Sequence, residues 1–437
     1  MNPRIQYVID YFRKLYQIPE SVHIGYGTWD GRVKVKSSKT SYFNILQNFD
    51  DSQVIWKKWK EDLLPVLFGE KDEGLLISEE KEGILVHDDL LLSAFFFLSG
   101  WQEYVFQYHK SGRSFPYEKS LQARLKITGE PIVQRYFDIL RTAVEQAYQI
   151  KLDVGDWQGK SWALCLTHDV DRCRTGWLED GFYLLKQRKF KNFADILSQR
   201  MRGRDTWFNF NEIHDLEDDF QAHSTFFFLT EKKQPDGENA DYHSSQSDIQ
   251  RIMDEIGRWG CGVGIHGSIG SHTNGSAFQK NLDNLGRPVL GSRFHYLSFH
   301  HPKTLAILEE AQLCYDTTLG FSDQTGFRNG TAMPFPLFDC QRNRPVPVLE
   351  IPLIVMDTTL RKDRKQQPEM IFEDVKELLN RVQQVRGCGS ILWHNNYFSH
   401  YKFQGWGELY RRLLENIHED AWLASGEEVY DHCKYLL

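Results

Sequence analysis

The sequence lacks any apolar run long enough to cross a membrane. A membrane-spanning helix needs about 20 consecutive apolar residues, and the longest candidate, residues 90–101, has little more than half of that length and follows two aspartates. The first 16 residues read as an amphipathic helix, without the basic, apolar and small-residue segments of a secretion signal. We therefore expect a cytoplasmic protein with no membrane span.

Cysteine pairs and proline are also scarce. The seven cysteines are an odd number, widely spread, with no pair at the spacing of a metal finger. This usage predicts reduced thiols rather than a disulfide framework. With only 14 prolines and 41% hydrophobic residues, a chain of 437 residues is a folded globular protein with room for two or three domains.

The sequence also has no excess of basic residues. The net charge is −8 and the pI is about 6.1, which argues against a dedicated nucleic-acid binder. Locally, residues 172–205 contain nine Lys or Arg and four Asp or Glu. Charge runs usually form a solvated helical surface, and that is our first interpretation. The alternative is that this segment attracts an anionic substrate or a phosphate-bearing lipid carrier.

The order of apolar segments predicts two domains. Residues 1–155 are predicted to form a smaller α+β domain, with an N-terminal helix, a hairpin over residues 74–86 and a buried helix over residues 88–105. The polar stretch 151–161 marks the boundary. In residues 156–437, strands expected at 162–166, 224–229 and 261–266 alternate with helices, which predicts a parallel sheet, open or closed into a barrel.

The segment ALCLTHDVDR contains the clearest candidate site. An apolar run ends at Thr167 and is followed by Asp169 and Asp171, two residues apart. If the strand stays extended, both carboxylates point to one face. Such a pair is poorly tolerated without a cation or a shared proton between them, so the pattern indicates a metal. The alternative is a turn that caps the next helix.

Four other ionisable residues follow apolar strands or lie in tight loops: His266, His295, Arg328 and His394. Each of them alone would more often be a structural residue. In parallel α/β folds, however, chemistry gathers at the carboxyl ends of the strands. Asp169 and His266 both fall at that end of their predicted strands.

In this order, the motifs THDVD, GIHGS, SRFHYLSF, YDTTLGFSDQTGFRNGTAMPFPLFD, EIPLIVMDTTL and WHNN resemble the polysaccharide deacetylase family, also called the NodB-homology domain or carbohydrate esterase family 4. The resemblance covers about residues 160–400. It implies a distorted (β/α) barrel in which Asp169 is the general base and Asp171 binds a metal. Here Val170 separates two acids that are usually adjacent in the family.

The family's second motif supplies two histidine ligands. His266 matches the first, but the second falls on Gly270, which has no side chain to bind a metal. We expect His295 to replace it, with His272 as the second choice.

The resemblance also assigns the remaining roles. Arg328 matches the arginine that orients the base, and His394 matches the general acid. Arg293 and His272 are candidates for substrate or support roles. Trp393, with Tyr397 and Phe398, could stack on a sugar, but packing in the core explains these aromatic residues equally well.

The implied activity is metal-dependent removal of acetyl groups from an N-acetylated or O-acetylated sugar, in a glycan or a lipid-linked precursor. Zn²⁺ is the expected cofactor, although other divalent ions suit such ligands. The motif set is similar to a bacterial branch associated with surface-polysaccharide gene clusters, in which a domain of unassigned function precedes the barrel. Two alternatives stay open: a glycan-binding scaffold that lost the metal, suggested by Gly270, and a hydrolase of another non-peptide C–N bond in a non-sugar substrate.

Overall fold

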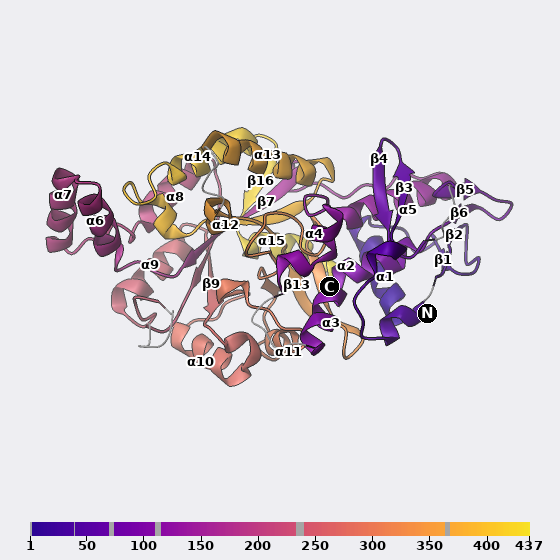
Figure 1. Cartoon of the computed structure of the whole chain (residues 1–437), viewed down its shortest axis with the longest axis horizontal. Helices are drawn as coiled ribbons and strands as arrows, with labels where there is room; N and C mark the ends of the chain where they lie inside the picture. The colour runs from indigo at the N-terminus through magenta and orange to yellow at the C-terminus, as the bar shows by residue number, and fades with distance from the viewer. Residues whose placement is uncertain (1, 39, 70–73, 110–114, 233–239, 363–367) are drawn as a thin grey trace.

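The computed structural model describes residues 2–38, 40–69, 74–109, 115–232, 240–362 and 368–437 (Figure 1). The N-terminal third contains the helices α1 (Pro3–Leu15), α2 (Leu90–Leu98), α3 (Trp101–His109), α4 (Leu121–Leu125) and α5 (Ile132–Tyr148). Its strands are β1 (Ile24–Tyr26), β2 (Val33–Val35), β3 (Ile55–Trp59), β4 (Asp62–Val66), β5 (Ile77–Glu79) and β6 (Ile84–Val86). The order β1-β2-β6-β5 forms one sheet, and β3 pairs with β4 in a separate hairpin.

Two predictions for this part can be compared with the structure. The hairpin expected over residues 74–86 is confirmed, because β5 and β6 pair antiparallel. The single buried helix expected over residues 88–105 is wrong, because the chain breaks at Gly100 into α2 and α3. Gly100 has a φ of +61° and lies against the ring of His301, where a Cβ would meet ring atoms at about 2.9 Å. Only glycine accommodates both constraints without strain.

The rest of the chain is built on a ten-stranded sheet of described residues. Its strands are β7 (Trp162–Val170), β8 (Thr225–Phe228), β9 (Gly262–Gly267), β10 (Gly291–Phe294), β11 (Tyr315–Asp316), β12 (Phe335–Asp339), β13 (Arg344–Glu350), β14 (Leu353–Met356), β15 (Cys388–Leu392) and β16 (Ala421–Ala424). The order is β12-β13-β11-β10-β9-β8-β7-β15-β14, with β16 also paired to β7. Every pair is parallel except β12 with β13.

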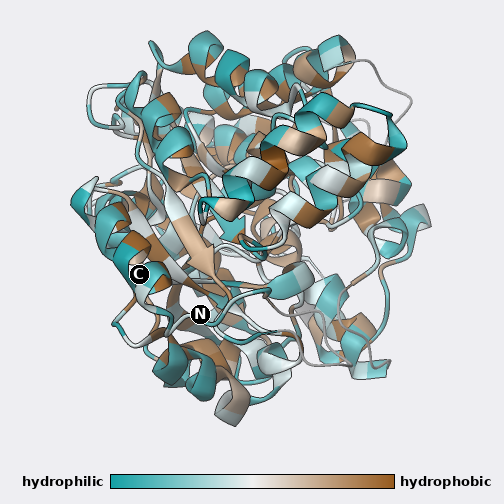
Figure 2. Ribbon diagram, turned by 90° about the vertical axis from the view of Figure 1, so that its left-hand side faces the viewer, coloured by the Kyte–Doolittle hydropathy of each residue, from teal (hydrophilic) through white to brown (hydrophobic). Residues whose placement is uncertain are grey.

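Helices follow most of these strands. They are α6 (Gly176–Lys186), α7 (Phe190–Met201), α8 (Phe210–Asp218), α9 (Ser247–Arg258), α10 (Gly275–Leu285), α11 (Lys303–Glu310), α12 (Asp357–Lys362), α13 (Pro368–Gln384), α14 (Trp406–Ile417) and α15 (Gly426–Cys433). Along their turns they alternate hydrophilic and hydrophobic residues, as helices with one buried face do (Figure 2). The predicted strand–helix alternation is therefore confirmed.

The sheet is curled rather than flat. Five strand intervals separate β10 from β14, which would be about 24 Å in a flat sheet. Yet Leu297, just after β10, packs in one cluster with Leu353 and Met356 of β14 and Leu392 of β15. The two parts of the sheet must therefore bend toward each other, which gives the α/β barrel architecture expected from the sequence, here open between β12 and β14.

The N-terminal part packs directly on this sheet. Tyr7 of α1 and Phe95 of α2 contact Phe338 of β12, with ring centroids 4.9 and 5.0 Å apart. Buried residues from both parts belong to one continuous core. The boundary near residue 155 stays a prediction.

Three further features of the sequence can be located. The basic segment is helical, and α6 and α7 project as a pair from one end of the molecule, opposite β1–β6 (Figure 1). All seven cysteines are free. None of the helices that the structure describes combines the length and apolar character that crossing a bilayer requires.

Candidate active site

Strand β7 positions the two predicted carboxylates. It runs to Val170, four residues beyond the expected end, so alternation of side chains applies up to the motif. His168 points to one face, where its ring nitrogens bond to the carbonyl oxygen of Trp393 and to Glu217. Asp169 and Asp171 line a cavity on the other face. The shared face expected from their spacing is confirmed.

Asp171, His266 and His295 form a cluster that could hold a metal ion. One ligand atom from each lies within 4.8 Å of the others. Asp171 follows β7, His266 ends β9, and His295 begins a 3₁₀ turn directly after β10. The Nε2 atom of His266 is 3.4 Å from Oδ1 of Asp171, and Nε2 of His295 is 3.7 Å from Oδ2. Parallel strands therefore bring together residues that are more than 120 positions apart in the sequence.

The chemistry of these donors fits a divalent cation. Nδ1 of His266 donates to the carbonyl oxygen of Arg293 at 2.8 Å, which leaves the Nε2 lone pair facing Asp171. Oδ1 of Asp171 is buried and has no hydrogen-bond partner. Burial by itself would raise the pKa of Asp171, but His295 and His266 hold it well below its usual value. Burial opposes charge on His266, yet the neighbouring carboxylates of Asp169 and Asp171 outweigh it and raise its pKa.

Asp169 is held beside this cluster by Arg293. Its Oδ1 accepts from NH1 of Arg293 at 2.9 Å, and its Oδ2 lies 3.6 Å from Nε2 of His266. Arg293 is fully buried and also donates to Thr167 and to the carbonyl and hydroxyl oxygens of Thr317. This guanidinium is therefore fixed in place and compensates the charge of Asp169.

The expected pairing of Arg328 with the base is wrong. Arg328 donates through Nε and NH2 to Glu103 of α3, and through NH1 to the carbonyl oxygen of Gly320. Because these contacts occupy the guanidinium, Arg328 joins the N-terminal part to the barrel and does not support Asp169. Arg293, which the sequence suggested only for support or substrate contact, occupies that position.

This difference leads to a stability prediction. The Glu103→Gln substitution leaves Arg328 buried and without a counter-charge, since both side chains are almost fully buried. Loss of one partner of a buried ion pair costs about 3–5 kcal/mol, so we expect a clearly lower urea midpoint of unfolding. Glu369→Gln is the control, because it breaks an exposed pair with Arg412 and should leave the midpoint unchanged. Equal midpoints for both variants would contradict this role of Arg328.

His394 lies at the end of β15, near the cluster. Its Nδ1 donates to Oδ1 of Asp357 at 2.8 Å, and its backbone N–H donates to Oδ2 of the same carboxylate at 2.6 Å. Nε2 therefore faces Asp171, whose Oδ2 is 3.8 Å away. Burial would lower the pKa of His394, but Asp357 outweighs it and raises the pKa to about 9. The sequence signal for Asp357 is the VMDTTL motif, which directly follows an apolar strand.

The cavity around these groups has a volume of about 350 Å³. Leu297, Met356 and Leu392 form an apolar wall. Tyr296, 47% exposed, stacks on His295 with ring centroids 4.1 Å apart. Lys362 also lines the cavity and donates to Asp323 at 2.8 Å.

Several sequence-based candidates are not placed in this cavity. Trp393 is fully buried against Trp406 and Tyr410, and Tyr397 and Phe398 are buried as well, so the expectation that they stack on a sugar is wrong. An apolar strand end does not reveal which of its aromatic rings face the core. His272 is buried with its ring edge-to-face on Phe294, and it does not line the cavity.

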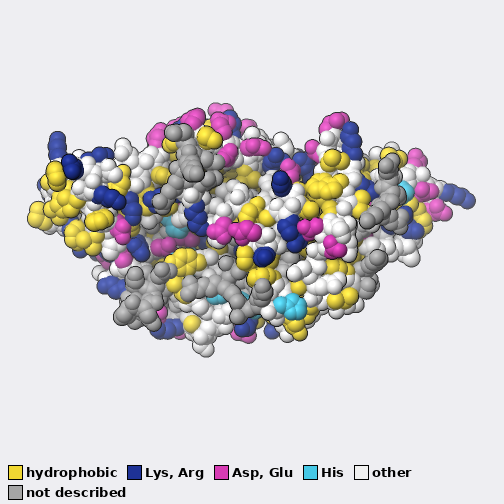
Figure 3. Space-filling view, in the orientation of Figure 1, with side chains coloured by type: hydrophobic (Ala, Val, Ile, Leu, Met, Phe, Trp, Pro, Cys, Tyr) yellow, Lys and Arg dark blue, Asp and Glu magenta, His cyan; other side chains and the backbone are white. Residues whose placement is uncertain are grey.

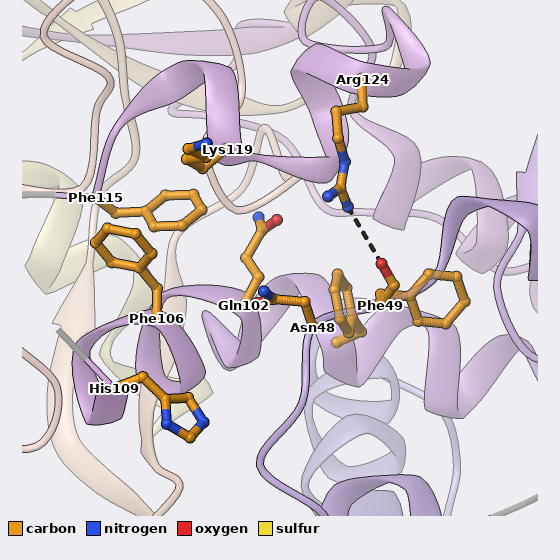
Figure 4. Close-up of a pocket in the computed structure, with 9 residues that line it drawn as sticks. Asn48, Phe49, Gln102, Phe106, His109, Phe115, Lys119 and Arg124 are labelled. Atoms are coloured by element: carbon orange, nitrogen blue, oxygen red, sulfur yellow. Dashed lines mark hydrogen bonds between the residues drawn. The ribbon is translucent and has the colours of Figure 1, made fainter.

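A second cavity, of about 170 Å³, lies in the N-terminal part (Figure 4). Phenylalanine side chains form much of its wall, and three of its polar side chains, Gln102, His109 and Arg124, already have structural partners. Gln102 bonds to Gln122 and to the backbone N–H of Leu121, while Arg124 pairs with Asp51 and points to the carbonyl oxygen of Phe49. We therefore place the candidate site in the barrel.

A comparison with known families matches the N-terminal part of the chain. Residues 1–149 match the sequence model of a family described as a family of unknown function, DUF7033. No curated protein matches the chain.

Solved structures resemble the chain over about two thirds of its length. A putative polysaccharide deacetylase from Mycobacterium smegmatis is 18% identical, with a TM-score of 0.41, and the match covers 64% of this chain and 92% of that one. The allantoinase Puue is 15% identical, with a TM-score of 0.40 and coverage of 63% and 92%. A probable polysaccharide deacetylase from Pseudomonas aeruginosa PAO1 is 11% identical, with a TM-score of 0.41 and the same coverage of 63% and 92%.

Proposed function

We propose that the chain is a metal-dependent hydrolase that removes acetyl groups from an N-acetylated or O-acetylated sugar, in a glycan or a lipid-linked precursor. The proposal is carried by one arrangement: Asp169 and His394 line the same cavity as the cluster of Asp171, His266 and His295. A candidate base and a candidate acid thus lie beside a candidate metal site.

A divalent cation held by the three clustered residues, with Zn²⁺ expected first, would polarise the acyl oxygen and lower the pKa of a bound water. Asp169 has the position of a general base that takes the proton from the attacking water. Arg293 keeps its carboxylate oriented. The base therefore needs no reorganisation when the reaction begins.

His394 would act as the general acid. Asp357 raises its pKa, which favours the protonated ring, and directs Nε2 toward the cavity. A proton given from Nε2 to the departing amine avoids expulsion of an unstable anion. The apolar wall formed by Leu297, Met356 and Leu392 suits the methyl group of an acetyl substrate.

Acetate release from an N-acetylated oligosaccharide tests this proposal. We expect Zn²⁺-loaded protein to release acetate, and metal-free protein prepared with a chelator to be at least about 100-fold slower and to recover on adding Zn²⁺. A panel of acetylated and cyclic non-sugar amides is measured in parallel. If the protein turns over only those compounds, its substrate is another C–N compound and not a sugar. A protein that binds sugar, holds no metal and ignores chelators would instead be a scaffold.

A further inference from the structure

The arm formed by α6 and α7 has a surface that the proposed hydrolysis does not use. Five of its large hydrophobic side chains are exposed: Leu178, Phe182, Leu185, Phe190 and Met201, the last 83% exposed. In Figure 3 hydrophobic side chains gather at this end of the molecule, with Lys and Arg beside them. Exposed apolar groups in such number at one place mark an interaction surface.

These side chains lie in stripes that the arm does not need for its own packing. Leu178, Phe182 and Leu185 follow the i, i+4, i+7 spacing of one helix face, and Phe190 and Met201, eleven residues apart, share one face of α7. Contact between the two helices uses other residues. Phe193 packs against Gly181, and Leu184 and Ile196 are buried. The side chains of these stripes are therefore available to contact a partner.

Charge on the arm is segregated as well. Seven cations are exposed: Lys186, Arg188, Lys189, Lys191, Arg200, Arg202 and Arg204. Three of the four acids in residues 172–205 face the body instead. Asp180 accepts from Thr206 and Ser399, Asp205 accepts from the backbone N–H of Gly176, and Glu179 pairs with Lys402. Within this fully described segment, Asp195 is the only exposed acid.

We propose that the α6–α7 arm docks on an anionic lipid bilayer, with its apolar stripes at the acyl boundary and its lysines and arginines on the headgroups. Exposed Phe, Leu and Met interleaved with Lys and Arg are the composition of helices that lie in a membrane interface. A second copy of the arm is a poor partner, because it would oppose cation to cation. The inference is independent of the chemistry in the barrel.

Sedimentation with vesicles tests this proposal on the full-length protein. We expect binding to vesicles of phosphatidylcholine with about 30% phosphatidylserine, at least tenfold weaker binding to phosphatidylcholine alone, and weaker binding at 0.5 M salt. The double variant Lys189→Glu/Lys191→Glu, and separately Phe182→Ser/Met201→Ser, should each lose at least tenfold in affinity.

Matched variants at exposed positions far from the arm provide the controls. Lys58→Glu/Lys81→Glu and Leu63→Ser/Leu75→Ser change the same residue types and should bind like the unchanged protein. Circular dichroism and thermal unfolding report whether the arm variants remain folded. The proposal is overturned if anionic and neutral vesicles bind equally, if the arm variants bind normally, or if the arm mediates self-association or duplex nucleic-acid binding in place of vesicle binding.

Discussion

The Asp169→Asn variant is expected to lose at least about 100-fold in kcat while it keeps its bound metal. The amide is nearly isosteric and can still accept the hydrogen bond from NH1 of Arg293, so the geometry at the end of β7 should persist. It cannot take a proton, and general base catalysis contributes typically about 10²–10⁴-fold to the rate. Steady-state acetate release, together with metal content by mass spectrometry, checks both parts.

Asp171→Asn provides the contrast, two residues further along the same segment. Because Asp171 supplies the only carboxylate of the described three-residue cluster, this change should lower both metal content and turnover. The base assignment is wrong if Asp169→Asn keeps kcat within tenfold of the unchanged protein. It is equally wrong if both variants lose metal to the same extent.

The second large effect is expected at His295. Removing one of three protein ligands should weaken Zn²⁺ binding at least about 100-fold and abolish turnover at limiting metal, so His295→Ala should show both losses. His272→Ala is the matched control, since His272 is also buried but packs on Phe294 outside the cavity. Titration with a competing chelator gives the affinities, and thermal unfolding verifies the fold.

If His272→Ala weakens Zn²⁺ binding and His295→Ala does not, His272 is the third ligand. If both variants keep full affinity, Asp171 and His266 bind metal with a donor from elsewhere, and the candidate site must be redrawn.

Much of the fold could be predicted from the local pattern of apolar and polar residues in the sequence. The apolar strands ending in Asp169, His266 and His394 were readable because burial of a parallel strand on both faces gives a continuous apolar run. The same pattern placed their polar residues at one edge of the sheet. Two predicted elements have the wrong bounds. The predicted helix continues through Gly100, where the chain breaks, and the predicted strand stops at the first polar residue, although Thr167 and His168 are buried within β7.

The hydrogen-bond partners of the site residues could not be predicted from local pattern in the same way. Arg293 and Arg328 both lie near small residues in the sequence, and nothing local distinguishes an arginine that reaches Asp169 from one that reaches Glu103 of α3. The role of Asp357 is similar. Its contact with His394 joins β14 to β15, and the pairing of those strands decides it.

The sequence by itself determined which residue types end each strand and that the strands would be parallel, and it indicated a cation beside the carboxylate pair, because these inferences follow from local periodicity and charge. Only the tertiary structure decided that His295 rather than His272 lies beside Asp171, that Arg293 holds Asp169, and that Trp393 belongs to the core. The physical reason is that strand order and the curl of the sheet fix the distances between segments more than 100 residues apart. The spacing of residues along the sequence does not determine those distances.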